Sequence, residues 1–255
     1  MKVAIIQTAL IWENPNANRI QFEENIRGIE QNVDLIVLPE MFSTGFTMNP
    51  ETVAETMNGE TISWMQTLAK HKNSAITGRL VIVENGKYYN RLVFVLPSGE
   101  IKHYDKRHLF SLAGEEKVYT KGKTKLIIEY KGFKICPLIC YDLRFPVFSR
   151  NVEDYDVLLY VANWPKPRIN AWNALLKARA IENMCYVVGV NRIGEDQNNH
   201  VYNGNSQVID YLGETLDEAN EKEGVFIATL DKRSLETTRT KLGFLKDKDV
   251  FTVTD

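Results

Sequence analysis

Three residues that could carry covalent chemistry each lie beside an apolar run. Glu40 follows Leu-Ile-Val-Leu-Pro, Cys140 follows Cys-Pro-Leu-Ile, and Lys106 lies in the stretch His-Tyr-Asp-Lys-Arg-His. Such positions at strand ends are where open α/β sheets bind their ligands. Acyl transfer by a cysteine needs a base to activate the thiol and a cation or amide hydrogens to stabilise the oxyanion. A cysteine, a glutamate and a lysine together meet these needs.

Each of the three residues also has a simpler interpretation when it is taken alone. Cys140 could be a core residue, because free cysteine is among the most buried residue types. Glu40 could be an ordinary loop glutamate and Lys106 part of a solvated loop. If Glu40 is buried beside a proline and two phenylalanines, desolvation is expected to raise its pKa towards that of a useful base. Cys136 and Cys185 lack a polar turn after them and are predicted to be core.

Alternating strands and helices must position these residues. The hydrophobic pattern predicts a layered α/β protein, because its helices have to cover both sheet faces. No repeat or linker divides residues 1–255, so one domain is expected, with a polar tail from about residue 241. Strands are predicted over 3–8, 33–38, 75–83, 88–96, 124–130, 133–139, 157–161, 186–191, 205–210 and 224–230, and helices over 17–31, 60–72 and about 168–183.

Composition excludes several classes of function. The chain has 255 residues, with 31 basic and 33 acidic side chains and a net charge of −2, and no basic stripe suggests a nucleic-acid partner. No apolar run approaches the roughly 20 residues of a membrane span, and the N-terminus is typical of a buried strand, so a cytoplasmic protein is expected. The three cysteines are expected to be reduced, and the four histidines have no metal-ligand spacing.

Longer segments around the three residues resemble one protein family. Pro-Glu40-Met-Phe-Ser-Thr-Gly-Phe, Tyr-Asp-Lys106-Arg-His-Leu-Phe and Ile-Cys140-Tyr-Asp-Leu-Arg-Phe-Pro have the order and spacing of the nitrilase, or carbon-nitrogen hydrolase, superfamily. The resemblance continues through Asn163-Trp164-Pro165, residues 178–183 and residues 190–194, so it covers essentially the whole chain. Within the superfamily the sequences of these motifs most resemble those of the bacterial omega-amidases. The resemblance implies a four-layer α-β-β-α sandwich and an enzyme without a cofactor.

The resemblance also implies a role for each residue of the triad. Cys140 would be the nucleophile, Glu40 the general base, and Lys106 would lie beside the oxyanion. The backbone N–H of Tyr141 would complete the oxyanion hole. A second glutamate assists in many members of the family, and in Leu-Ala-Gly-Glu-Glu the better match is Glu115, with its neighbour Glu116 left open.

Omega-amidases cleave the terminal amide of 2-oxoglutaramate and 2-oxosuccinamate, which gives 2-oxoglutarate or oxaloacetate and ammonia. Such a substrate needs a cation at its far end, and Arg144 is the candidate because a guanidinium offers two parallel donors to a carboxylate. The alternative for Arg144 is a structural ion pair with Asp142. Asn163, Trp164 and Phe46 are candidates for the pocket wall, although aromatic residues at strand ends are often simply core.

Other functions stay open from the sequence alone. A nitrilase, an N-carbamoyl hydrolase or an amidase for another small carboxylated substrate would use the same triad. A different mechanism would pair Cys140 with His108 or His103, and a catalytically silent binding protein could share the fold. Asn170-Ala171-Trp172 lacks a histidine that many relatives have, and the loop 195–200 lacks a common glycine, which leaves substrate choice open. The resemblance further suggests a homodimer or larger homo-oligomer.

Overall fold

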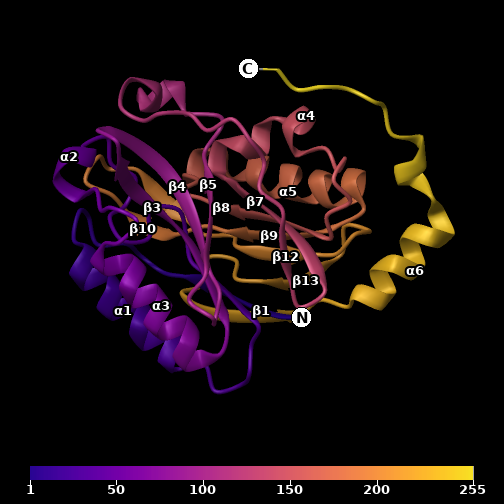
Figure 1. Cartoon of the computed structure of the whole chain (residues 1–255), viewed down its shortest axis with the longest axis horizontal. Coiled ribbons are helices and arrows are strands. Elements are labelled where there is room, and N and C mark those ends of the chain that lie inside the picture. Colours follow the sequence, from indigo (N-terminus) through magenta and orange to yellow (C-terminus); the bar gives the residue numbers. More distant parts are fainter. Residues whose placement is uncertain (255) are drawn as a thin grey trace.

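Two six-stranded β-sheets form the centre of the structure, a computed structural model in which residues 1–254 are described (Figure 1). The first sheet contains β1 (Lys2–Gln7), β2 (Leu35–Val37), β3 (Ala75–Glu84), β4 (Lys87–Val95), β5 (Ile101–Asp105) and β14 (Gly224–Thr229). The second contains β6 (Ile128–Tyr130), β7 (Phe133–Ile139), β8 (Val157–Val161), β9 (Tyr186–Val190), β12 (Gln207–Ile209) and β13 (Thr215–Glu218). A small ribbon pairs β10 (Ile193–Glu195) with β11 (Val201–Asn203).

Helices cover the outer faces of the two sheets. The covering helices are α1 (Pro15–Arg27), α3 (Glu60–Lys72), α5 (Ile169–Asn183) and α6 (Lys232–Leu242), and the one-turn helices α2 (Pro50–Val53) and α4 (Pro146–Ser149) lie in connecting segments. In Figure 1, α1 and α3 lie on one side of the sheets, and α5 and α6 lie on the other. None of the helices within residues 1–254 is long and apolar enough to cross a membrane.

Alternation along β1 shows how the layers are held together. Val3 and Ile5 belong to the core shared with the second sheet, whereas Ala4 and Ile6 belong to the core beneath α1 and α3. Successive strand residues point to opposite faces, so this one strand contributes to both interfaces. On the far side Trp172 of α5 packs into the core of the second sheet. The chain is therefore the four-layer α-β-β-α sandwich that the family resemblance implied.

Parallel pairing gathers several strand ends at one edge. β1, β2 and β3 run parallel, as do β7, β8 and β9. β5 is antiparallel to β4, which is antiparallel to β3, so β5 also runs in the direction of β3. Glu40, Lys106, Cys140 and Asn163 follow the carboxyl ends of β2, β5, β7 and β8 respectively. The fold thus provides the strand-end site that the spacing predicted.

Most predicted elements are confirmed, but the short elements α2, α4, β10, β11 and β13 were not predicted, and neither were β5 and α6. β5 ends directly before Lys106, so the solvated loop that was the alternative for this charged stretch is not found; β5 is an edge strand, where charged side chains can face solvent. α6 was not predicted, because Leu235 is its single fully buried residue and the helix is otherwise polar. α6 extends into the predicted tail as far as Leu242, and residues 248–254 contain no helix or strand.

Candidate active site

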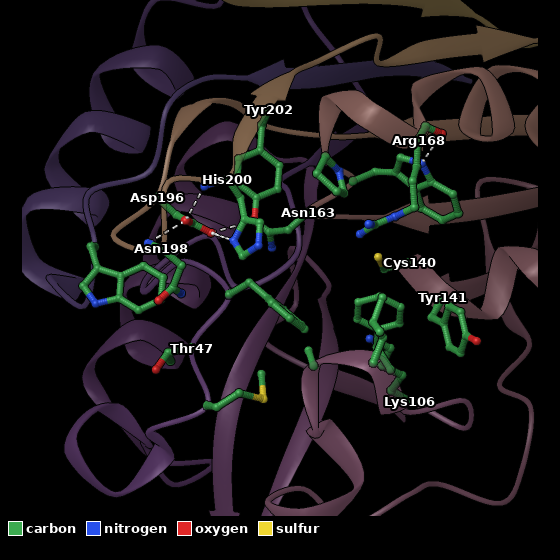
Figure 2. Close-up of a pocket in the computed structure, with 18 of the residues that line it drawn as sticks. Thr47, Lys106, Cys140, Tyr141, Asn163, Arg168, Asp196, Asn198, His200 and Tyr202 are labelled. Atoms are coloured by element: carbon green, nitrogen blue, oxygen red, sulfur yellow. Dashed lines mark hydrogen bonds and ion pairs between the residues drawn. The ribbon is translucent and has the colours of Figure 1, made fainter.

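Cys140 lies at a sharp turn between a strand and a short helix. It is the first residue of the 3-10 turn Cys140–Arg144, directly after β7, and its φ of 42° is in the left-handed region that non-glycine residues seldom adopt. This geometry directs the side chain away from the strand, and Cys140 lines a cavity of about 550 Å³. Figure 2 shows Tyr141 and Lys106 near its sulfur, with Asp196, His200 and Tyr202 across the cavity.

A cluster of buried charges lies beside Cys140. The Nζ of Lys106 is 3.2 Å from Oε1 of Glu40, and it is 2.9 Å from Oε2 and 3.2 Å from Oε1 of Glu115. All three side chains are fully buried. The structure therefore brings together Glu40, Lys106 and Cys140 with Glu115, and the exposed Glu116 is outside the cluster.

Two asparagines hold the carboxylates in place. The backbone N–H of Asn163 donates to Oε2 of Glu40 at 2.9 Å, and its side-chain amide donates to the Glu40 carbonyl at 2.7 Å. The side-chain amide of Asn90 donates to Oε1 of Glu40 at 3.0 Å and to Oε1 of Glu115 at 2.5 Å. Asn90 accepts in turn from Nε of the buried Arg79. Every carboxylate oxygen of Glu40 thus has a donor.

The pKa of Glu40 is shifted in the direction opposite to the one predicted from the sequence. Burial raises the pKa of this carboxyl, as expected, but Lys106 and Arg79 lower it by charge attraction, and hydrogen bonds from Asn90 and Asn163 lower it further. The pKa of Glu40 lies below its ordinary value of 4.5 as a result. The prediction of a raised pKa was wrong because it included burial and omitted the two buried cations.

The pKa of the Cys140 thiol is shifted upwards, in contrast to that of Glu40. Burial and the negative charge of Glu40 raise its pKa well above the ordinary 9.0, and the opposing effect of Lys106 is smaller. Burial lowers the pKa of Lys106, but Glu115 and Glu40 raise it well above its ordinary value. At neutral pH the proton therefore resides on the sulfur, while Glu40 is a carboxylate and Lys106 an ammonium ion.

Arg144 is placed at the cavity and is available to a ligand. Its guanidinium carbon lies 4.9 Å from the centre of the Trp164 ring, and both residues line the cavity. Arg144 forms no ion pair within residues 1–254. The alternative ion pair with Asp142 is not formed, because that carboxylate instead accepts from Tyr104 Oη at 2.8 Å and from the Ile139 N–H at 3.0 Å.

The other predicted pocket residues also line the cavity. The Phe46 ring centre is 5.7 Å from Nζ of Lys106, and Trp164 donates from its indole to the Arg168 carbonyl at 2.8 Å. Asn163 lines the cavity as well, although its N–H groups are used to hold Glu40. Tyr141 packs its ring 5.0 Å from that of Phe110.

Neither histidine of the alternative mechanism reaches Cys140. His108 places Nδ1 2.8 Å from Oδ1 of Asp142 and stacks on Phe145 with ring centres 3.8 Å apart. It is not among the residues that line the cavity, and His103 lies exposed on β5. The geometry therefore offers Glu40 and not a histidine as the base for this thiol.

The remaining cysteines are structural. Cys136 and Cys185 are fully buried free thiols, so their prediction as core residues is confirmed. Burial raises the pKa of Cys136 to about 12. Within residues 1–254 no group of three or more histidine, cysteine, aspartate or glutamate side chains is arranged to hold a metal ion.

Sequence reasoning missed Arg79, Asn90 and Arg168. Arg79 and Asn90 are buried polar residues in the strands β3 and β4, and a polar or charged residue inside such a strand is a signal that could have found them. Arg168 lines the cavity, with its guanidinium carbon 5.4 Å from the centre of the Phe110 ring. No periodicity marks Arg168, because it lies in a short turn before α5.

Comparison with known proteins gives the family. Residues 2–240 match the family model described as carbon-nitrogen hydrolase. The chain belongs to the carbon-nitrogen hydrolase family. This hydrolase is 43% identical over 253 residues to the protein named omega-amidase YafV of Escherichia coli (strain K12), a match that covers 98% of both chains. It is 32% identical over 256 residues to the 2-oxoglutaramate amidase of Bacillus subtilis (strain 168), again covering 98% of both.

A solved structure agrees with this assignment. XC1258 from Xanthomonas campestris, described as a CN-hydrolase superfamily protein with an arsenic adduct in the active site, superimposes with a TM-score of 0.97. It is 40% identical to the present hydrolase, and the match covers 100% of this chain and 99% of that one.

Proposed function

We propose that this carbon-nitrogen hydrolase is an omega-amidase, which cleaves the terminal amide of 2-oxoglutaramate and 2-oxosuccinamate and releases ammonia. One observation carries the proposal: the Cys140 thiol lies beside the buried Glu40–Lys106–Glu115 cluster, in a cavity that also contains Arg144. The relatives named omega-amidase and 2-oxoglutaramate amidase support this substrate class.

In the acylation step, Sγ of Cys140 attacks the amide carbon while Glu40 accepts the thiol proton. The ionised Glu40 and the protonated thiol at neutral pH are the states that this transfer requires. The Lys106 ammonium and the Tyr141 N–H stabilise the oxyanion, because fixed donors in a buried site need little reorganisation. The C–N bond then breaks, Glu40 returns its proton to the leaving nitrogen, and ammonia departs from a thioester.

In the deacylation step, Glu40 acts a second time as base. It accepts a proton from water as the water oxygen attacks the thioester carbon. The C–S bond breaks, the carboxylic acid product forms, and the sulfur recovers its proton from Glu40. One water is consumed and one ammonia is formed in each cycle, and Cys140 ends as a thiol.

Glu115 supports the reaction by fixing Lys106. Its Oε2 lies 2.9 Å from the ammonium and also accepts the backbone N–H of Phe110 at 2.6 Å. A lysine held in this way is already charged and in position before the reaction begins, so no conformational entropy has to be lost to place it in the transition state.

The far end of the substrate binds Arg144. A guanidinium stacked on Trp164 has its edge free for a carboxylate, and such charge-assisted pairs are the strong hydrogen bonds of a site. Oδ1 of Asn163 has no partner within residues 1–254, so we propose that it accepts from the substrate amide nitrogen. Phe46 and Trp164 form the apolar wall of the pocket.

Ammonia release tests the substrate assignment. The wild type and Cys140→Ala are assayed with 2-oxoglutaramate, glutamine, asparagine, a simple nitrile and an N-carbamoyl amino acid. The proposal expects Cys140-dependent turnover of the 2-oxo amide, well above that of the other substrates. If the nitrile or the carbamoyl compound were turned over preferentially, the enzyme would use the triad for another reaction of the family, and the substrate assignment would be wrong. No turnover of any substrate would favour a silent binding protein.

We propose further that the enzyme acts in the cytoplasm as a homodimer or larger homo-oligomer. Its three free cysteines suit a reducing compartment. Light scattering coupled to gel filtration measures the oligomer, and fractionation of the native cells measures the location. A monomer at micromolar concentration, or enzyme found outside the cytoplasm, would contradict the respective part of the proposal.

A further inference from the structure

Arg79 is a fully buried arginine behind the active site. It lies on β3 opposite Leu92, and Asn90 lies opposite Val81, two positions further along the same ladder. Side chains two residues apart on a strand share a face, so Arg79 and Asn90 are diagonal neighbours. Arg79 does not line the cavity and forms no ion pair within residues 1–254. Its guanidinium carbon lies 5.4 Å from the centre of the Tyr119 ring, and the titratable groups that act on it are Tyr119, Glu40 and Glu115. Any effect of Arg79 on the reacting groups must therefore pass through other side chains or through its charge.

The side-chain amide of Asn90 connects Arg79 to both carboxylates. Its NH₂ group donates to Glu40 at 3.0 Å and to Glu115 at 2.5 Å, while its Oδ1 accepts from Nε of Arg79. An ionised carboxylate can only accept, and an arginine can only donate. This order of donors and acceptors therefore admits one orientation of the Asn90 amide. Without Arg79 the buried Oδ1 would lose its partner, and the amide would be held only through its NH₂ group.

Arg79 also completes the charge balance of the cluster. Glu40 and Glu115 carry two negative charges, and Lys106 supplies one positive charge within 3.2 Å of them. Arg79 adds the second positive charge, so that the four side chains together are neutral. An uncompensated charge in a buried site is costly, and the usual response is that a group takes up or loses a proton.

We infer that Arg79 is a positioning residue for catalysis, which orients Glu40 and Glu115 through Asn90 and balances the charge of this buried cluster. This inference rests on the proposed function, because it presumes that Glu40 is the base for Cys140. Attraction by Arg79 is one of the causes that hold the pKa of Glu40 low. Loss of the cation should therefore protonate Glu40 at a higher pH than in the wild type.

The test compares Arg79→Met with Arg79→Lys. Arg79→Met removes both the charge and the Nε–H, and we expect the acid limb of kcat/KM to move up by about one pH unit, so that activity on the acid limb falls about 10-fold. KM should change less than kcat, because Arg79 does not line the cavity. Arg79→Lys keeps the charge and loses the Nε–H, so it should retain the wild-type acid limb with a reduced kcat.

A second readout requires no amide substrate. Alkylation of Cys140 by iodoacetamide, followed by intact mass with Cys140→Ala as the blank, should show the same shift of its acid limb in Arg79→Met. The inference would be overturned if folded Arg79→Met had the same acid limb as the wild type in both assays. A kcat of Arg79→Lys equal to that of the wild type would also overturn it. If Arg79→Met does not fold, Arg79→Lys alone decides. Failure of the proposed function is separate, since it would appear in the wild type itself, as preferred turnover of another substrate class, as no turnover, or as turnover that survives Cys140→Ala.

Discussion

Replacement of Glu115 by glutamine should weaken both stability and catalysis. The two carboxylate oxygens of Glu115 are both used: Oε1 accepts from Asn90, Oε2 accepts from the Phe110 N–H, and both lie within 3.2 Å of the Lys106 ammonium. Glutamine has the same shape but carries an NH₂ group in place of one oxygen. Whichever oxygen is replaced, the new donor faces an existing donor.

The magnitude follows from the burial of the pair. Breaking a buried ion pair by removing one partner costs about 3–5 kcal/mol. For a chain of this size each kcal/mol lowers Tm by about 2–4 °C, so a loss of roughly 10 °C is expected. The misplaced Lys106 should stabilise the oxyanion less well, and loss of one such group lowers kcat by about 10²-fold.

The adjacent Glu116 supplies a matched control. Its side chain is exposed, so Glu116→Gln should change Tm by about 1 °C or less and kcat by less than about two-fold. Thermal unfolding by circular dichroism and ammonia release at saturating 2-oxoglutaramate measure the two effects. A wild-type Tm and kcat for Glu115→Gln, or a larger effect for Glu116→Gln, would refute the reasoning.

Three further predictions concern proton transfer, acid stability and substrate binding. Because the pKa of Glu40 is held below 4.5, kcat/KM should be flat near neutral pH and fall only below about pH 4.5, and an acid limb at pH 6–7 in brief assays would contradict this. The same ionisation stabilises the fold above pH 4.5, and this contribution is lost as the pH falls through the lowered pKa, which acid unfolding measures. Arg144→Met should raise KM for 2-oxoglutaramate and lower kcat/KM by about 10–100-fold, from the loss of one charge-assisted contact. Equal kcat/KM values for wild type and Arg144→Met would remove Arg144 from the binding site.

The reacting groups could be identified from the sequence, but the direction of their pKa shifts could not. Glu40 and Cys140 could be identified because each follows an apolar run, and Lys106 because it lies in a recognisable segment. The direction of the Glu40 pKa could not be predicted, because its cations lie far away in the chain; Lys106 is 66 residues from Glu40. Asn163 shows the same limit, since the hydrogen bonds that hold Glu40 span 123 residues and no local pattern encodes them.

The differences in secondary structure have local physical causes. The polar surface of α6 weakened its apolar periodicity, although its capping residues carried a usable signal: Asp231 accepts from the N–H groups of Arg233 and Ser234, and Gly243 ends the helix with a φ of 70°. β5 is short and charged, as edge strands often are, so its composition is close to that of a loop.

The most direct test of the central claim is detection of the acyl-enzyme. The enzyme is mixed with 2-oxoglutaramate, quenched in acid within the first turnover, and digested for peptide mass spectrometry. The account predicts one 2-oxoglutaryl group in thioester linkage on Cys140, which hydroxylamine removes and which is absent from Cys140→Ala. Turnover of the amide without this adduct, or an adduct on Cys136 or Cys185 instead, would contradict it.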